Sequence, residues 1–171
     1  MPDLPVVLES LPVHGAPSPS ATSHRLRVSG LVRTPVSLTV AQLERFPQEL
    51  LTEDFTCEEG WTVPSQRWRG VCVRDLLDAA RVSTATACVE FAAGEFRFTL
   101  PMDQARRALV ALRLNDEQLT RWQGGPMRLV VPGAACFTSI KWLEQICVRH
   151  DRGTNRAKRI ALARITPSAT E

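Results

Sequence analysis

The cysteine in the stretch FTCEEGW, residues 55–61, is the first residue of this sequence whose type and setting point to chemistry. Reactive free cysteines usually lie beside cationic groups that stabilise the thiolate, whereas Cys57 is followed by Glu58 and Glu59. Two interpretations remain open. Cys57 is either a small hydrophobic residue of the core, or a ligand whose sulfur is kept ionised by a metal. One thiolate suits a soft or redox-active metal whose remaining ligands come from an organic cofactor.

A second candidate site lies in GGPMRLVVPG, residues 124–133. Gly124 and Gly125 allow another segment to approach the backbone closely, and Pro126 stiffens the entry to a strand. The planar guanidinium of Arg128 is suited to a phosphate or to an oxygen-rich heterocycle. The alternative is a hairpin loop whose arginine is simply solvated.

The third candidate is TSIKW, residues 138–142. If Thr138 and Ser139 begin a helix, its free backbone N–H groups, the Ser139 hydroxyl and Lys141 can converge on one phosphate. The alternative is ordinary N-capping by one of the two hydroxyls, with Lys141 in water.

Composition limits the classes of protein to consider. The 171 residues are 44% hydrophobic and 23% charged, which is typical of one soluble domain without a membrane span. A net charge of +3 is too small by itself to indicate nucleic-acid binding. Five widely spaced cysteines argue against a disulfide framework, and three histidines are poor material for a Cys/His zinc site. The start of the chain shows no export signal, so we expect a cytoplasmic protein.

The elements that must position these residues are short strands and short helices without regular βα alternation, which predicts an α+β fold with mixed sheets in a single domain. The expected strands are 25–32, 50–57, 87–92, 95–100, 109–115 and 127–133, and the expected helices follow Thr39, Val71, Pro101 and Thr138, the last running through Ile146. Residues 58–69, with Trp61 and Trp68, are predicted to form a loop. The other cysteines, Cys72, Cys88, Cys136 and Cys147, are interpreted as core residues.

The chain divides into an N-terminal arm (1–28), partly extended or flexible, a folded domain (29–148) and a basic C-terminal tail (149–171). The tail is a solvated surface, a cover for an anionic ligand of the same domain, or a nucleic-acid contact. No interleaved aromatic residues and no helix-turn-helix pattern accompany it, so nucleic-acid binding is the least favoured of the three.

Taken in order, the motifs F-T-C-E-E-G-W, R-W-R-G-V, R-D-L-L, G-G-P-M-R-L-V-V-P-G and S-I-K-W resemble the oxidoreductase molybdopterin-binding domain family. This is the catalytic domain of sulfite oxidases, plant-type nitrate reductases and the bacterial protein-methionine-sulfoxide reductase catalytic subunit. The resemblance covers residues 29–148 and implies a sulfite-oxidase-type fold. Where relatives commonly have an aromatic-Gly-aromatic-Lys run, this chain has Ala135-Cys136-Phe137-Thr138.

The resemblance implies that Cys57 is both the catalytic cysteine and the thiolate ligand of molybdenum in a molybdenum–molybdopterin cofactor. It implies that Arg128 contacts the pterin, that Ser139, Ile140 and Lys141 hold the terminal phosphate, and that Gln123 makes a polar contact to the cofactor.

The implied activity is the transfer of an oxygen atom to or from a small substrate, with an unidentified electron-transfer partner. The alternative is a non-catalytic member of the fold that acts as a cofactor-binding or interaction module. A tyrosine helps to shape the anion pocket of sulfite oxidases, and this chain contains no tyrosine. This argues against sulfite oxidation of the usual kind.

Overall fold

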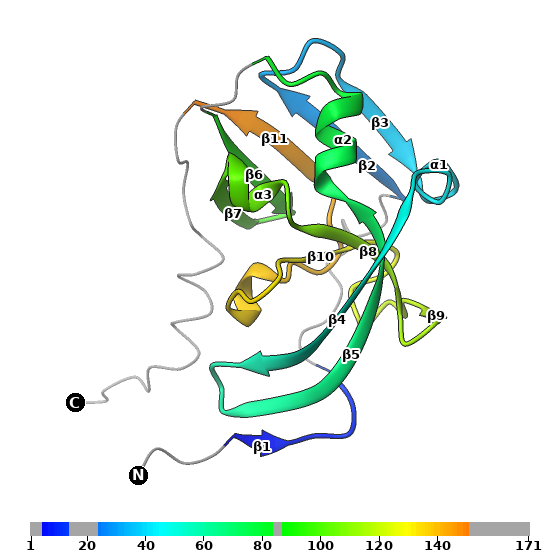
Figure 1. The fold of residues 1–171 in the computed structure, drawn as a ribbon, viewed down its shortest axis with the longest axis vertical. Coiled ribbons are helices and arrows are strands. Elements are labelled where there is room, and N and C mark those ends of the chain that lie inside the picture. Colours follow the sequence, from blue (N-terminus) through cyan, green and yellow to red (C-terminus); the bar gives the residue numbers. More distant parts are fainter. Residues whose placement is uncertain (1–4, 14–23, 84–86, 151–171) are drawn as a thin grey trace, which may run out of the picture.

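Two separate sheets of mostly short strands form the framework of the domain, as Figure 1 shows for the computed structural model. The structure describes residues 5–13, 24–83 and 87–150. Most strand pairs are antiparallel, but each sheet contains one parallel pair, β1 with β5 and β2 with β11. The predicted α+β class with mixed sheets and short helices is therefore confirmed.

The six-stranded sheet contains both Cys57 and Arg128, each at the end of a strand. Its strands are β1 (Val6–Val7), β4 (Gln48–Cys57), β5 (Trp61–Cys72), β8 (Leu109–Leu114), β9 (Glu117–Gln118) and β10 (Arg128–Val130). The central path runs β1-β5-β8-β10, with β4 paired to β5 and β9 paired to β8. The long β4–β5 hairpin curves away from the rest of the domain in Figure 1.

The five-stranded sheet carries the main apolar core. Its order is β3-β2-β11-β6-β7, and its strands are β2 (Arg25–Gly30), β3 (Val36–Thr39), β6 (Cys88–Ala93), β7 (Phe96–Pro101) and β11 (Gln145–Arg149). Helix α2 (Val73–Ala79) lies across this sheet in Figure 1, and its Leu76 and Leu77 are fully buried in the same cluster as Ile146.

Two further short helices agree with their sequence signals. Helix α1 (Val40–Leu43) begins with the capping box that the T-V-A-Q pattern predicts: Thr39 accepts from the backbone of Gln42, and the Gln42 side chain accepts from the backbone of Thr39. Helix α3 (Met102–Ala105) follows Pro101, where one or two helical turns were expected, and forms a single turn.

Two predicted elements are wrong. Residues 58–69 do not form a loop, because all of them from Trp61 onward belong to β5. The strand is interrupted by an irregularity near Ser65, which has a φ of 53° and donates its backbone N–H to Asp54. Pro64 and Ser65 are residue types common in turns, so the local sequence did not indicate a strand at this irregularity.

The helix predicted from Thr138 through Ile146 is also wrong. Only Cys136–Thr138 form a short 3-10 helix (η1), and residues 145–149 form β11. β11 pairs with β2 on one side and with β6 on the other. These long-range pairings outweigh the local helical spacing of Trp142, Leu143 and Ile146.

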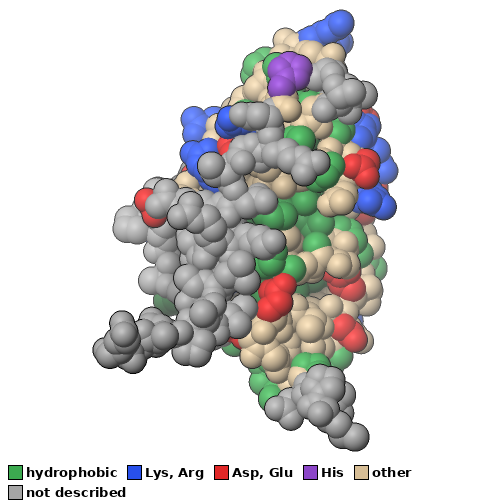
Figure 2. Space-filling view, turned by 90° about the vertical axis from the view of Figure 1, so that its left-hand side faces the viewer, with side chains coloured by type: hydrophobic (Ala, Val, Ile, Leu, Met, Phe, Trp, Pro, Cys, Tyr) green, Lys and Arg blue, Asp and Glu red, His purple; other side chains and the backbone are tan. Residues whose placement is uncertain are grey.

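No helix among the described residues has the length and apolar character needed to span a membrane. Figure 2 shows one face of the domain, on which Lys and Arg side chains stand mainly towards the edges of the upper half with hydrophobic side chains between them.

Candidate active site around Cys57 and Arg128

The β4–β5 hairpin brings Cys57 to the edge of the six-stranded sheet. Cys57 is the last residue of β4, and its carbonyl accepts the backbone N–H of Gly60 in the tight turn that follows. Gly60 has a φ of +92°, a conformation that favours glycine. Side chains alternate along β4, so Phe55 and Cys57 both point inward and are buried, whereas Thr56 is exposed.

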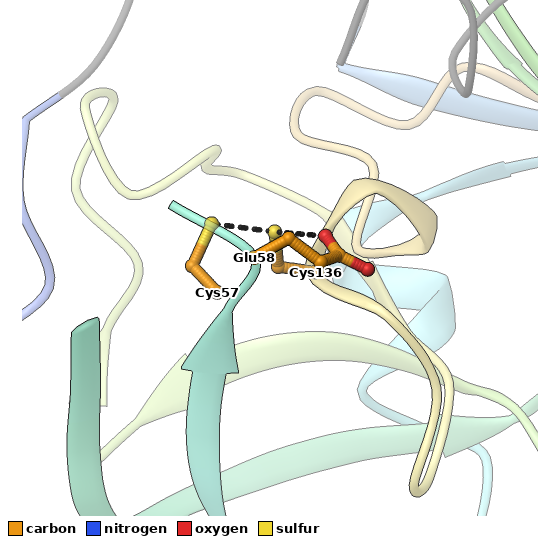
Figure 3. Close-up of side chains that lie close together, drawn as sticks. All are labelled: Cys57, Glu58 and Cys136. Carbon is orange, nitrogen blue, oxygen red and sulfur yellow. Dashed lines mark hydrogen bonds between the residues drawn. The ribbon is translucent and has the colours of Figure 1, made fainter. Parts of the chain in front are cut away.

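A second cysteine meets Cys57 at this position. The Sγ atoms of Cys57 and Cys136 lie 2.6 Å apart, although the two residues are 79 positions apart in the sequence. The Cys136 thiol also donates to Oε2 of Glu58 at 3.3 Å. Figure 3 shows the three side chains converging, Cys57 and Glu58 from the hairpin and Cys136 from η1. Their potential ligand atoms all lie within 4.8 Å of one another.

The surroundings of Cys136 keep its thiol protonated. Burial is the main cause that raises the pKa of Cys136 above its ordinary value, and the hydrogen bond with Cys57 raises it further. The interpretation of Cys136 as an ordinary core residue is therefore incomplete. It packs partly against the apolar cluster of Phe55 and Trp68, but its sulfur faces Cys57.

Arg128 lies in the interior, next to the cysteine pair. It is 5% exposed, and its guanidinium carbon lies 5.2 Å from the ring centroids of both Phe55 and Trp68. Its Nε donates to the Ser139 hydroxyl at 3.1 Å and its Nη1 donates to the Gln123 carbonyl at 2.9 Å. The alternative of a solvated hairpin arginine is thereby excluded.

Within the described residues, the charge of Arg128 has no carboxylate partner. Burial lowers the pKa of Arg128 to about 10, and the opposing effect is the electrostatic interaction with Cys136. No Asp or Glu of the described ranges forms an ion pair with this guanidinium. A buried charge without a counter-charge is unfavourable, so the geometry is that of a site prepared for an anionic or oxygen-rich ligand. Trp68 Nε1, in the same cluster, is a buried donor without a hydrogen-bond partner in the described part of the chain.

The remaining residues singled out in the sequence lie around Arg128. Ser139 is buried and donates to the Leu129 carbonyl while accepting from Arg128, so its role is to hold the guanidinium. Gln123 contributes its backbone carbonyl to Arg128, whereas its side-chain oxygen accepts from the backbone of Thr120.

Ile140 and Lys141 connect this network to the glycine loop. Ile140 is buried, and its carbonyl accepts from the backbone of Leu129. Lys141 donates its Nζ to the Trp122 carbonyl at 2.8 Å. Its side chain passes so close to Gly124 that a Cβ added there would lie 2.7 Å from the Lys141 Cβ. The close approach expected at Gly124 is therefore present, whereas the helix expected to begin at Thr138 and Ser139 is not, because the 3-10 helix of this segment ends at Thr138.

Sequence reasoning missed two residues of this site. Cys136 and Phe55 were not singled out as parts of it, although they lie beside Cys57 and Arg128. Trp68 was singled out, but in a predicted loop rather than in a strand against the Arg128 guanidinium. The signal for Phe55 was available, because it lies two positions before Cys57 on a strand and so shares its face. Nothing local in the sequence placed Cys136 opposite Cys57.

The site thus brings two thiols and a buried arginine together on a scaffold of mixed sheets. The family model described as oxidoreductase molybdopterin binding domain matches residues 13–157. The chain belongs to this family.

Individual relatives agree with this assignment. The chain is 34% identical over 128 residues to the uncharacterized oxidoreductase YuiH of Bacillus subtilis, covering 73% of this chain and 65% of that protein. It is 30% identical to the nitrate reductase [NAD(P)H] of Hordeum vulgare, covering 84% of this chain and 20% of the relative. It is 25% identical to the sulfite oxidase of Arabidopsis thaliana, covering 74% and 42%. The chain therefore spans about two thirds of one of these relatives and less than half of the other two.

The fold has a counterpart among solved structures. The sulfane dehydrogenase SoxCD from Paracoccus pantotrophus superposes with a TM-score of 0.70 at 24% identity, covering 77% of this chain and 39% of that chain. At this level of identity the match shows a shared fold, and it confirms the predicted sulfite-oxidase-type architecture.

Proposed function

We propose that this chain binds a molybdenum–molybdopterin cofactor and transfers an oxygen atom to or from a small substrate. The observation that carries the proposal is Arg128, a buried guanidinium without a carboxylate partner in the described residues. Its guanidinium lies against the ring of Phe55, and Phe55 precedes Cys57 by two positions in the sequence. A pterin with its phosphate supplies the oxygen and nitrogen acceptors that such a guanidinium requires.

Each residue of the site has a separate task in this proposal. Cys57 supplies the protein's thiolate to the metal, and Arg128 orients the pterin. Ser139 and the Gln123 carbonyl keep the guanidinium in place through hydrogen bonds. Ile140 anchors the segment to β10, and Lys141 contributes a cation near the phosphate. When bound, the cofactor supplies two-electron oxygen-atom transfer, and the chain contributes binding, orientation and electrostatics.

The surroundings of Cys57 support a small substrate rather than a large one. Cys57 is 8% exposed and pairs at the end of the hairpin with Trp61, whose ring centroid lies 5.9 Å from that of Phe55. A redox cycle of this kind needs an electron-transfer partner, and we propose a separate carrier in the cytoplasm.

The test is the metal and pterin content of protein made in a host that produces the cofactor. We expect molybdenum near one equivalent by elemental analysis, together with the fluorescence of the released, oxidised pterin. Cys57→Ser removes the thiolate ligand, so its molybdenum content should fall at least tenfold, since even the loss of an outer-shell partner weakens metal affinity about 10–100-fold. Cys88→Ser is the matched control, because Cys88 begins β6 in the other sheet.

The two outcomes separate the proposal from its alternative. Molybdenum that is lost only in the Cys57 variant supports a cofactor-dependent oxidoreductase. Wild-type protein that contains neither metal nor pterin, in a host that loads another molybdopterin enzyme, contradicts it and favours a non-catalytic member of the fold.

A further inference from the structure

The contact between Cys57 and Cys136 has properties that cofactor binding does not use. Both thiols belong to ordered segments that pack against each other, the end of β4 and the 3-10 helix η1. η1 is held by two hydrogen bonds to Ala135, from the backbone and from the hydroxyl of Thr138. The two sulfurs are therefore kept together by the fold, and they are the only pair of thiols in contact among the described residues.

The spacing of the two sulfur atoms distinguishes two ways in which the pair can react. A tetrahedral metal with bonds of about 2.3 Å holds two cysteine sulfurs about 3.8 Å apart. A disulfide bond is about 2.05 Å long. The observed 2.6 Å is nearer to the bonded pair than to the pair that shares a metal. The exposed side chain of Glu58 adds only one oxygen ligand, so a metal would also lack a fourth protein ligand in this group.

We infer that Cys57 and Cys136 form a reversible disulfide in the cofactor-free protein, with a low-molecular-weight disulfide as the oxidant. Formation of this bond is a modification of the chain that its proposed activity neither requires nor implies. It joins the residue expected to bind the metal to a residue that no local sequence pattern places beside it.

The reaction balances as a double thiol–disulfide exchange. One of the two sulfurs, as its thiolate, attacks the small disulfide R–S–S–R, forms a mixed disulfide and releases the first R–SH. The sulfur of the other cysteine then attacks the protein sulfur of the mixed disulfide, forms the intramolecular bond and releases the second R–SH. Two protein thiols are oxidised, one small disulfide is reduced, and the two hydrogens leave on the released thiols.

The consequence for the site follows from the chemistry of sulfur and rests on the proposed function. A cysteine in a disulfide has no thiolate to offer to a metal. The oxidised chain therefore keeps its fold and its buried Arg128 but cannot ligate molybdenum through Cys57. A small thiol restores the ligand by reversing the exchange.

The experiment uses the full chain from a host that cannot make molybdopterin. The protein is reduced, desalted without oxygen, incubated with oxidised glutathione, denatured in acid and alkylated. We expect the number of alkylated cysteines to fall from five to three and the unalkylated mass to fall by about 2 Da, because two hydrogens are lost. Peptide mapping should recover one linked pair, Cys57 with Cys136, which dithiothreitol separates.

Variants isolate the pair. Cys136→Ser should retain four alkylatable thiols or carry a glutathione adduct on Cys57, whereas Cys88→Ser should still form the link. If Cys136→Ser fails to fold by circular dichroism, the mapped link in the wild-type chain decides the question by itself. Five alkylated thiols after oxidation, a link between other cysteines, or stable glutathione adducts on both residues would each overturn the inference. Retention of added Zn²⁺ that protects both thiols without a link would overturn it in favour of a metal pair.

A loading experiment separates this inference from the proposed function. Molybdopterin with molybdenum is offered to the reduced and to the oxidised chain, and bound pterin is measured after gel filtration. Uptake by the reduced chain alone supports both ideas. If the link forms but neither state takes up the cofactor, the proposed function fails and the disulfide stands. If no link forms and the reduced chain binds the cofactor, the disulfide fails and the proposed function stands.

Discussion

The core beneath α2 and the site around Arg128 differ in the kinds of side chain that they contain. The core is a continuous cluster of aliphatic and aromatic side chains, including fully buried Leu26, Phe91 and Ile146. The site instead contains two thiols in contact and a buried guanidinium without a carboxylate in the described residues. Both regions are buried, yet only the first follows the rule that apolar groups fill the interior.

The difference shows where stability and function reside. Burial of apolar surface is favourable, whereas a desolvated charge without a counter-charge is costly. A sequence retains such a group when a ligand supplies the missing interaction, and the apolar core elsewhere offsets the cost. Under the proposed function, the apolar core beneath α2 provides most of the stability, and the six-stranded sheet with η1 provides ligand recognition.

The largest expected effect is in the core. Phe91→Ala should lower the free energy of unfolding by about 3–5 kcal/mol, because it removes a fully buried ring and leaves a cavity. The measurement is urea denaturation monitored by tryptophan fluorescence. Phe96→Ala is the matched control, since Phe96 is 36% exposed on the neighbouring strand, and its effect should stay below about 1 kcal/mol. Equal losses for the two variants would remove the distinction between core and surface in this sheet.

A smaller effect is expected at the glycine that lets Lys141 approach. Gly124→Ala should cost about 2–3 kcal/mol, because φ is +97° and the new Cβ would overlap Lys141. Gly60→Ala is the control, since its φ is +92° but nothing lies within 4 Å of its added Cβ. Its cost should be about 1 kcal/mol, from the backbone alone. Thermal denaturation of both variants gives the difference, and a Gly60 variant as unstable as the Gly124 variant would contradict the overlap.

The smallest effect should have the opposite sign. Arg128→Met removes a buried charge together with two hydrogen bonds, so the cofactor-free chain should be unchanged or more stable by about 1–2 kcal/mol. The same variant should lose cofactor binding. Chemical denaturation measures the first effect, and pterin fluorescence measures the second.

A surface arginine provides the reference for that comparison. Arg107→Met, whose side chain is 72% exposed, should change stability by less than about 0.5 kcal/mol and leave cofactor binding intact. A loss of more than about 2 kcal/mol in Arg128→Met would show that the guanidinium stabilises the fold. In that case the contribution of Arg128 to folding would explain its burial, without a ligand.

Several elements were predictable because their signals are local. The capping box at Thr39 involves residues three positions apart, and α1 follows it as expected. The alternation of Phe96, Phe98 and Leu100 predicted a strand, and β7 begins at Phe96. Each signal depends on neighbours in the sequence, which any tertiary arrangement preserves.

The errors arose where distant segments decide the local structure. Trp142, Leu143 and Ile146 have the helical spacing of apolar groups, but pairing with β2 and β6 makes residues 145–149 a strand. Trp68 was predicted to lie in a loop, yet it is fully buried in β5. The predicted basic tail lies, from residue 151 onward, outside the described residues.

The sequence by itself determined the residue types of the site, the order of its motifs and the family they indicate. Only the tertiary structure decided that Arg128 is buried against two aromatic rings and that Cys136 touches Cys57. Both facts depend on how β4, β10 and η1 are brought together by sheet pairing. Such pairing joins residues many positions apart, so no local pattern specifies it.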